Sequence, residues 1–147
     1  MSKRRSRMNN RLELFELIGV LARRRFQAAE RAFAPIGLNH TEARLLTILD
    51  LESGEATQDA LSNSLTIDRS NAGRALKRLE QRGYIARRRD DTDSRTNLVH
   101  LTDAGADAVE EVSKLRREVA SDFFSDLTEA DAGAITDLLE KALIVRG

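Results

Sequence analysis

The sequence predicts a mainly α-helical protein with one small β-hairpin. Apolar residues recur at spacings of three and four along most of the 147 residues, as in amphipathic helices. The pattern becomes extended only over residues 84–101, around a charged tip. One Pro and eight Gly leave room for long helices. With 41% hydrophobic and 33% charged residues, we expect one globular domain over residues 1–147.

The first expected helix spans residues 11–34. Pro35 and Gly37 follow it and end it. An aromatic stripe of this kind packs in a core or a dimer interface more often than it lines a ligand pocket, although both remain open. The stripe consists of Phe15, Ile18, Ala22, Phe26, Ala29 and Phe33.

Three helices are expected before the hairpin. Asn39 with Glu42 three residues later is a capping box, and that helix ends near residues 53–54. Thr57 caps a short helix over 57–65. Asp68 caps the next helix, which ends at Gly83, a residue type that favours a left-handed C-terminal turn.

The hairpin and two further helices complete the expected order. Residues 84–89 and 97–101 form the strands, and Thr102 caps a long helix over 103–125. Thr128 with Asp131 opens the last helix, to about residue 145.

The long apolar stripes within 11–34 and 103–145 exceed what a small lobe can cover. We therefore expect a homodimer built from these end helices.

Charge is segregated along a chain of zero net charge. Residues 1–31 carry net +6 and residues 32–65 net −4, whereas residues 66–102 carry net +4 and residues 103–147 net −6. The basic blocks suggest a polyanionic partner. Twenty of the 24 basic residues are Arg, whose forked guanidinium fits phosphate and guanine, although genomic codon bias would also enrich Arg.

The helices over 57–65 and 68–83 have a helix-turn-helix outline. Residues 72, 75, 76 and 79 form the apolar face of the second helix. Its other face combines hydroxyl, amide and cationic groups, the types that touch base edges and phosphates. The alternative is an ordinary solvated face of an amphipathic helix. The residues on this face are Arg69, Ser70, Asn71, Gly73, Arg74, Lys77 and Arg78.

The hairpin adds a second basic element. Arg87, Arg88 and Arg89 lie on its first strand, and Arg95 follows the tip. Arginine side chains on a hairpin suit a narrow, electronegative minor groove, with Asp93 placed to orient Arg95. The alternative is a charged edge strand that resists aggregation.

Together these residues resemble the MarR family of transcriptional regulators. The resemblance implies a homodimer with two winged helix-turn-helix lobes over residues 40–102, a pseudo-palindromic operator in double-stranded DNA, and often release by a small aromatic or phenolic ligand. Ala60, Asp91 and the basic arm at residues 3–7 depart from the common pattern. The most specific matching segments are Thr57-Gln58, residues 68–71, residues 79–85, Arg87-Arg88, residues 93–95 and residues 101–105.

Other kinds of site lack their residues. There is no Cys, so signal sensing is expected through reversible ligand binding rather than thiol oxidation. His40 and His100 are isolated in sequence, and no nucleophile–base pair or phosphate loop is present, so we expect no metal, no cofactor and no enzyme activity. No apolar run approaches a membrane span and no signal-peptide core follows residues 1–5, which favours a cytoplasmic protein.

The sequence therefore predicts a sequence-specific DNA-binding regulator. The resemblance implies a dimeric repressor released by a small ligand, whereas the sequence leaves repressor versus activator open. The alternative is a winged-helix module for protein–protein contact. A ligand pocket is expected between the helix over 40–52, the long helix after Thr102 and the DNA-binding lobe; its residues are not predicted. The expected DNA-binding residues are Thr57, Gln58, Arg69, Ser70, Asn71, Gly73, Arg74, Lys77, Arg78, Arg87, Arg88, Asp93 and Arg95.

Overall fold

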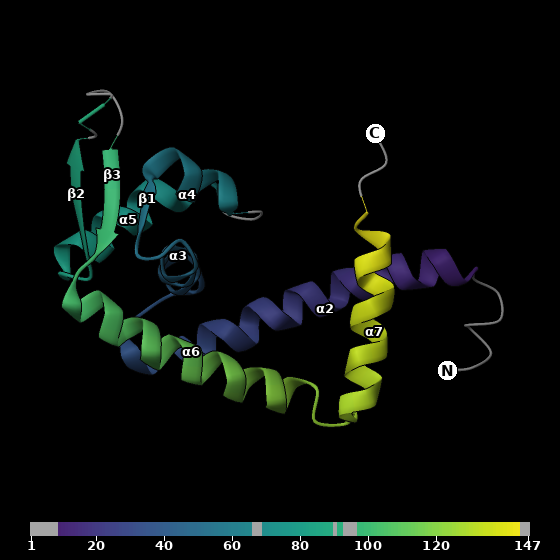
Figure 1. Cartoon of the computed structure of the whole chain (residues 1–147). Coiled ribbons are helices and arrows are strands. Elements are labelled where there is room, and N and C mark those ends of the chain that lie inside the picture. The colour runs from purple at the N-terminus through teal and green to yellow at the C-terminus, as the bar shows by residue number, and fades with distance from the viewer. Residues whose placement is uncertain (1–8, 66–68, 90, 93–96, 145–147) are drawn as a thin grey trace.

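The computed structural model describes residues 9–65, 69–89, 91–92 and 97–144. It is mainly helical, with a small sheet at one end and two long helices, α2 and α6, extending away from it (Figure 1). The elements are α2 (Asn10–Phe33), η1 (Ala34–Ile36), α3 (His40–Leu51), β1 (Glu55–Thr57), α4 (Gln58–Ser64), η2 (Arg69–Asn71), α5 (Ala72–Gln81), β2 (Ile85–Arg89), β3 (Asn97–Leu101), α6 (Asp103–Phe123) and α7 (Glu129–Ala142).

Side-chain caps set most of the helix starts. Asn39 and Glu42 form the predicted capping box of α3, each side chain bonding the other residue's backbone N–H at 2.8 Å. Thr57 and Thr102 accept from backbone N–H groups as the caps of α4 and α6. The capping box of Thr128 before α7 is also present. These local interactions explain why the expected helix boundaries agree closely with the structure.

The sheet has three strands rather than the two of the predicted hairpin. β3 lies in the centre and pairs antiparallel with β2 and with β1, in the order β1-β3-β2. β1 has only three residues, too few to show an alternating pattern. It joins the sheet because the chain leaving α3 passes beside β3, where Ala56 pairs with Val99.

The second helix of the helix-turn-helix starts later than predicted. Residues 69–71 form the short 3-10 turn η2, and the α-helix begins at Ala72. The predicted cap, Asp68, lies outside the described residues. At the other end Gly83 has φ +79°, the left-handed conformation expected of a glycine after a helix.

The core is centred on α3. This helix contacts α2, α5 and α6, and its residues Leu45, Leu46 and Leu49 have no exposed surface. Leu76 and Leu79 of α5 are equally buried. Helix α3 therefore connects the sheet end of the molecule to the two long helices, α2 and α6.

Much apolar surface lies outside this core. The first half of α2 exposes Leu14, Phe15 and Ile18, and Phe15 is 75% exposed. Helix α7 has no buried residue and lies away from the sheet end (Figure 1), with Leu138 and Leu143 exposed. Ala29 and Phe33 in the second half of α2 are buried, so the predicted stripe splits into a core half and an uncovered half.

Candidate nucleic-acid interface

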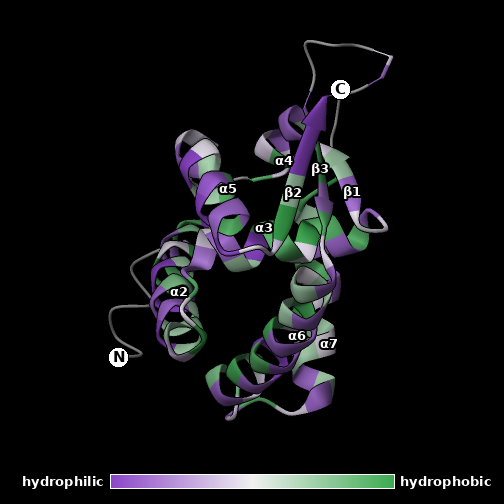
Figure 2. Ribbon diagram, turned by 90° about the vertical axis from the view of Figure 1, so that its left-hand side faces the viewer, coloured by the Kyte–Doolittle hydropathy of each residue, from purple (hydrophilic) through white to green (hydrophobic). Residues whose placement is uncertain are grey.

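Helix α5 has one buried face and one basic face. Ala72, Ala75, Leu76 and Leu79 are buried, and the outward side of the helix is mostly hydrophilic (Figure 2). Arg74 and Lys77 are exposed there. Within the described part of the chain, neither side chain takes part in an ion pair. Their charges are therefore available to an external anion.

The residues before α5 lie at the tip of this basic face. Ser70 and Asn71 are exposed in η2, and Arg69 is its first residue. The sequence predicts that these residues form the first turn of the helix, but in the structure they precede it. At Gly73 an added Cβ would meet no atom within 4 Å, so a partner's backbone or base could approach closely there.

Arg78 is attached to the core side of the lobe. Its Nη1 lies 3.8 Å from Oε2 of Glu42, whose side chain is only 4% exposed, whereas that of Arg78 is 52% exposed. Glu42 also caps α3, so the guanidinium end of Arg78 lies beside a carboxylate of the lobe, and its exposed part can still carry charge to a phosphate.

Arg87 is bound within the protein. Its side chain is 23% exposed and donates to Oε1 of Glu80 from Nη2 at 2.8 Å and from Nε at 3.2 Å. Nη1 donates to Oε1 of Gln58 at 3.2 Å. The hydrogen bonds to Arg87 hold the pKa of the Glu80 carboxyl below its ordinary value. Arg87 thus joins β2 to α5 and α4, a positioning role that the sequence pattern did not reveal.

The rest of the predicted wing is only partly described. Arg88 is exposed and pairs with Glu55 at 3.1 Å and with Asp91 at 4.0 Å. Arg89 is exposed at the end of β2. Asp93 and Arg95 lie outside the described residues, so their predicted roles remain proposals.

Thr57 and Gln58 also have roles inside the lobe. The Thr57 hydroxyl accepts from the N–H of Ala60 at 3.1 Å, as the cap of α4. Gln58 accepts from Arg87 at the start of the same helix. Both residues are half-buried, so neither is closed off from solvent by these contacts.

Arg82 is a structural link that the sequence analysis missed. Its guanidinium donates to the carbonyl oxygens of Gly37 and Ile36 and to the Tyr84 hydroxyl. It also lies 5.0 Å from the centre of the Tyr84 ring. The end of α5 is thereby fixed to the segment that joins α2 and α3. The bonds join residues about 45 positions apart, which no local pattern could indicate.

A cavity of about 380 Å³ lies between α2, α3 and α6. The sequence placed a pocket beside α3 and α6, but with the DNA-binding lobe as its third wall; the structure has α2 there instead. The reason is that α2 folds back along both helices, so that its second half, including Phe33, closes this side. His40 lines the cavity and meets the Phe26 ring edge-on at 5.1 Å.

Metal binding and membrane crossing each need an arrangement that the described residues do not contain. Among the residues that the structure describes, no three His, Asp or Glu side chains are grouped so as to hold a metal ion. Over the same residues, no helix combines the length and the apolarity needed to cross a membrane.

The geometry of α4, η2, α5 and the β2–β3 hairpin is that of a winged helix-turn-helix. Residues 38–96 match the model of the MarR family. The chain is 30% identical over 105 residues to the uncharacterized HTH-type transcriptional regulator YdgJ of Bacillus subtilis, covering 71% of this chain and 63% of YdgJ. The family-model match and this relative support a MarR-family winged-helix regulator, as the sequence resemblance predicted.

A second relative and a solved structure agree with this assignment. The transcriptional repressor MprA of Escherichia coli is 30% identical over 108 residues, covering 73% of this chain and 61% of MprA. The aligned part thus spans less than two thirds of either relative. A mutant MarR from Escherichia coli, solved in complex with operator DNA, matches with a TM-score of 0.80 at 23% identity, over 92% of this chain and 97% of that one. This likeness supports the winged-helix fold.

Proposed function

We propose that the protein is a sequence-specific DNA-binding transcription regulator that acts as a homodimeric repressor. The observation that carries the proposal is the outer face of α5, where exposed cations without internal partners follow exposed hydroxyl and amide groups. A helix with this face, rigidly packed on its other side, fits the major groove of double-stranded DNA.

The described residues divide into base-reading and phosphate-binding groups. Arg74 lies on the outer face of α5, where its fork can pair with guanine, and Ser70 and Asn71 lie at the tip. Arg78 and Lys77 are placed to bind phosphates. In this proposal Arg87, with Gln58 and Glu80, holds the wing against the recognition helix rather than binding DNA directly.

The tip of the wing is proposed to enter the minor groove. Arg95 would supply the guanidinium and Asp93 would orient it, while Arg88 on the described strand reaches the flanking backbone. If Asp93 only offsets charge, Asp93→Asn should strengthen operator binding. Weaker specific binding by Asp93→Asn, with loss of A·T flank preference in Arg95→Ala, supports the orienting role.

The dimer would be built from the ends of the chain, 11–34 and 103–145, and would carry two DNA-binding lobes at residues 40–102. The exposed apolar residues of α2 and α7 supply the surface for it. Two recognition helices about 34–36 Å apart would match one turn of a pseudo-palindromic operator. A regulator of chromosomal genes acts in the cytoplasm, which is the location we propose.

Repression and ligand release complete the proposal. The relative MprA is named a transcriptional repressor, and the cavity between α2, α3 and α6 has room for a small effector, such as an aromatic molecule. An effector there would release DNA if it binds better to a lobe arrangement that does not fit the operator.

The test is DNA binding by the full chain. Fragments of the source genome that the protein retains should share a pseudo-palindrome, and binding to it should weaken steeply with salt, by about 0.9 in the log–log slope per phosphate contact. The double variant Arg74→Ala/Lys77→Ala should lose binding, while Arg24→Ala on α2 removes a cation elsewhere as the control. Failure to shift any duplex at moderate salt would support a protein–protein module instead.

A further inference from the structure

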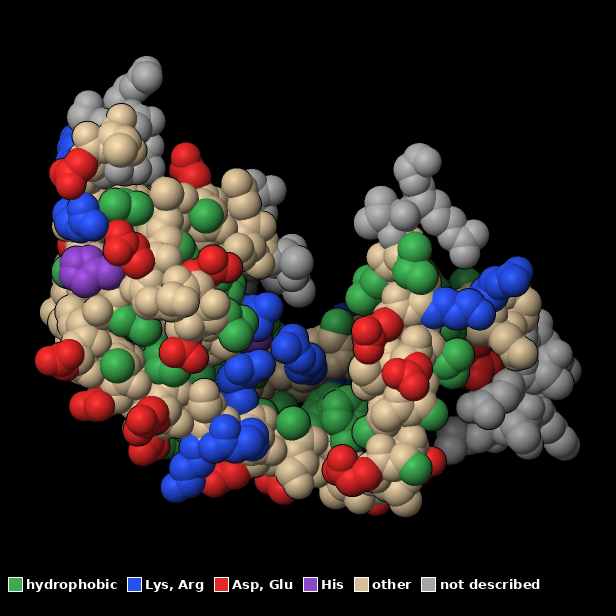
Figure 3. Space-filling view, in the orientation of Figure 1, with side chains coloured by type: hydrophobic (Ala, Val, Ile, Leu, Met, Phe, Trp, Pro, Cys, Tyr) green, Lys and Arg blue, Asp and Glu red, His purple; other side chains and the backbone are tan. Residues whose placement is uncertain are grey.

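The lobe that carries α5 is supported from its base. Helix α5 packs against α3, α4 and β2, all within the lobe. In Figure 3, which has the orientation of Figure 1, a hollow separates the sheet end from α7, so in the described part of the chain α7 does not hold the lobe from that side. The direction of α5 relative to α2 therefore depends on the contacts at the base of the lobe.

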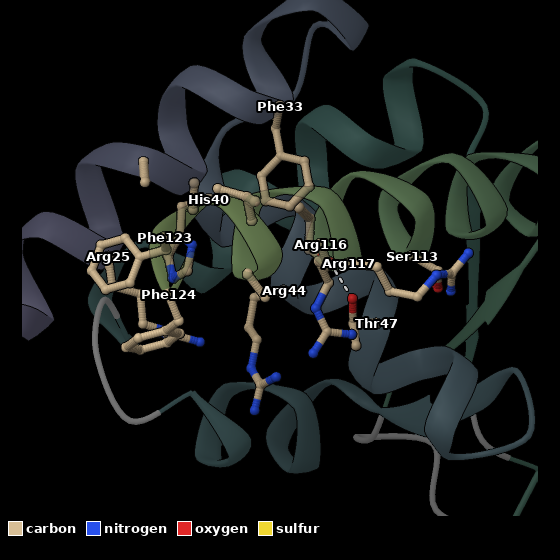
Figure 4. Close-up of a pocket in the computed structure, with 15 residues that line it drawn as sticks. Arg25, Phe33, His40, Arg44, Thr47, Ser113, Arg116, Arg117, Phe123 and Phe124 are labelled. Carbon is tan, nitrogen blue, oxygen red and sulfur yellow. Dashed lines mark hydrogen bonds between the residues drawn. The ribbon is translucent and has the colours of Figure 1, made fainter. Parts of the chain in front are cut away.

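The segment between α2 and α3, residues 34–39, is a rigid extension of α2, and we call it the α2–α3 joint. The Leu38 N–H donates to the Phe33 carbonyl at 3.2 Å. The Glu30 side chain of α2 accepts from the His40 N–H at 2.6 Å, just beyond the joint. Phe33 and His40, on either side of the joint, both line the cavity in Figure 4, which places the joint against the long helices. A residue bonded to the joint is therefore bonded in effect to α2.

Arg82, the C-terminal cap residue of α5, makes that bond with several atoms at once. Its Nη1 donates to the Gly37 carbonyl, and its Nη2 donates to the Ile36 carbonyl at 3.3 Å and to the Tyr84 hydroxyl at 3.2 Å. A Cβ at Gly37 would lie only 3.0 Å from Nη2, so the guanidinium covers a position that glycine leaves open. Because one planar group makes all these contacts, its orientation is fixed more tightly than a single hydrogen bond would fix it.

The contacts of Arg82 are directional rather than strongly stabilising. Among the described residues, Arg82 forms no ion pair with a carboxylate, and its partners are neutral carbonyl and hydroxyl oxygens. The residue is exposed, so water competes for the same donors and the net gain in folding free energy is small. What these bonds determine is the position of the end of α5 against the joint.

We propose that Arg82 is a positioning residue that sets the direction of α5 relative to α2 and, in the homodimer, the distance between the two recognition helices. The inference rests on the proposed function, since it concerns the fit of a dimer to two half-sites. Helix α2 belongs to the proposed dimer body, whereas α5 contacts DNA. One extra base pair between half-sites moves one of them by about 3.4 Å and turns it by about 35°, and only a dimer of fixed spacing can reject it.

The first test measures the spacing without DNA. The chain has no Cys, so Lys77→Cys introduces a single site for a spin label on the exposed face of α5 in each protomer. Double electron–electron resonance on the full-length dimer should give one narrow distance peak. Adding Arg82→Gln should widen the distribution about twofold or more, because the lobe then samples several positions. Adding Arg24→Gln instead, which removes an exposed cation from α2, should leave the peak unchanged. A peak for Arg82→Gln as narrow as that of the labelled parent, and at the same distance, would overturn the proposal.

The second test measures the spacing with DNA, on the unlabelled chain. The operator recovered from genomic fragments is compared with versions that have one base pair added or removed between the half-sites. The wild type should bind the altered operators about tenfold or more weakly, whereas Arg82→Gln should bind all three within about threefold. Uniformly weaker binding by Arg82→Gln, with spacing discrimination intact, would show that Arg82 only stabilises the lobe and would overturn its positioning role. If Arg82→Gln does not fold, Arg82→Lys, which keeps the charge without the planar fork, replaces it in both tests with the same expected losses.

The two tests separate this inference from the proposed function. Failure to bind any duplex would refute the proposed function, while the label distances would still decide the role of Arg82. An unchanged narrow peak in Arg82→Gln, together with specific operator binding by the wild type, would refute this inference alone. A labelled chain that gives no distance between protomers would refute the dimer and this inference together.

Discussion

Gly105 lies where α6 starts against the beginning of β2, and its replacement offers a quantitative test of the structure. A Cβ at this position would overlap the Tyr84 carbonyl oxygen and lie 3.0 Å from its carbon and 3.1 Å from Leu101 Cδ2. The same Tyr84 oxygen accepts from the Thr102 N–H at 3.1 Å. The substitution Gly105→Ala must therefore move backbone rather than a flexible side chain.

The magnitude follows from three contributions. Alanine gains up to about 1 kcal/mol over glycine in a helix. Overpacking costs about 1–3 kcal/mol, and weakening the backbone hydrogen bond to Tyr84 costs about 1 kcal/mol more. The steric terms exceed the helical gain, so we expect Gly105→Ala to destabilise the protein by about 1–3 kcal/mol.

The assay is urea unfolding followed by circular dichroism at a fixed protein concentration. Gly73→Ala is the matched control, because an added Cβ there meets nothing within 4 Å and the helix should gain up to about 1 kcal/mol. The two alanine substitutions should therefore have opposite signs. A Gly105→Ala protein as stable as the wild type would refute the close approach of α6 to β2.

Three further outcomes are expected. Arg74→Ala should cost about 1–3 kcal/mol in operator binding and relax the preference at one or two base pairs. Arg78→Ala should instead weaken binding to all duplexes alike and lower the salt slope by about 1. In competition titrations, discrimination by Arg74→Ala equal to that of the wild type would contradict this assignment. Because the pKa of Glu80 is lowered in the folded state, its bond to Arg87 stabilises the protein above the ordinary carboxyl pKa of 4.5, and this stabilisation is lost as pH falls through the folded pKa. The difference in unfolding free energy between the wild type and Glu80→Gln should therefore shrink on acidification. A constant difference from pH 7 to pH 3 would argue against a stabilising Glu80–Arg87 bond. Deleting residues 128–147 should abolish dimerisation or folding in sedimentation and circular dichroism, and a well-folded monomer would disprove the role of α7.

Helix boundaries were predictable because local interactions determine them. Asn39 with Glu42, and Thr128 with Asp131, are separated by three residues, so each capping box is visible in the sequence and present in the structure. The left-handed Gly83 is another local signal. The predicted start of α5 was wrong by about one turn. A 3-10 turn and an α-helix have nearly the same apolar spacing over three residues, so the sequence pattern does not distinguish them.

Contacts between distant segments were not predictable. The basic neighbours of Arg87 in sequence predict that it binds DNA, but they give no sign of its bond to Gln58, which is 29 positions away. The arginines of the cavity lie at positions 25, 44, 116 and 117, and no sequence pattern connects them. Knowledge of which helices pack together is needed before such a group can be recognised.

The bonds of Arg82 make the C-terminal end of the recognition helix a pivot. That end is held to the carbonyls after α2, whereas the other end leads into the turn at residues 69–71. Ten residues of α-helix are about 15 Å long, so a tilt of about 10° at the pivot would move the far tip by about 3 Å. That displacement is as large as the length of a hydrogen bond to a base. In the DNA complex proposed above, a small rotation of α2, transmitted through the Arg82 guanidinium, would therefore be enough to break a hydrogen bond between α5 and a base.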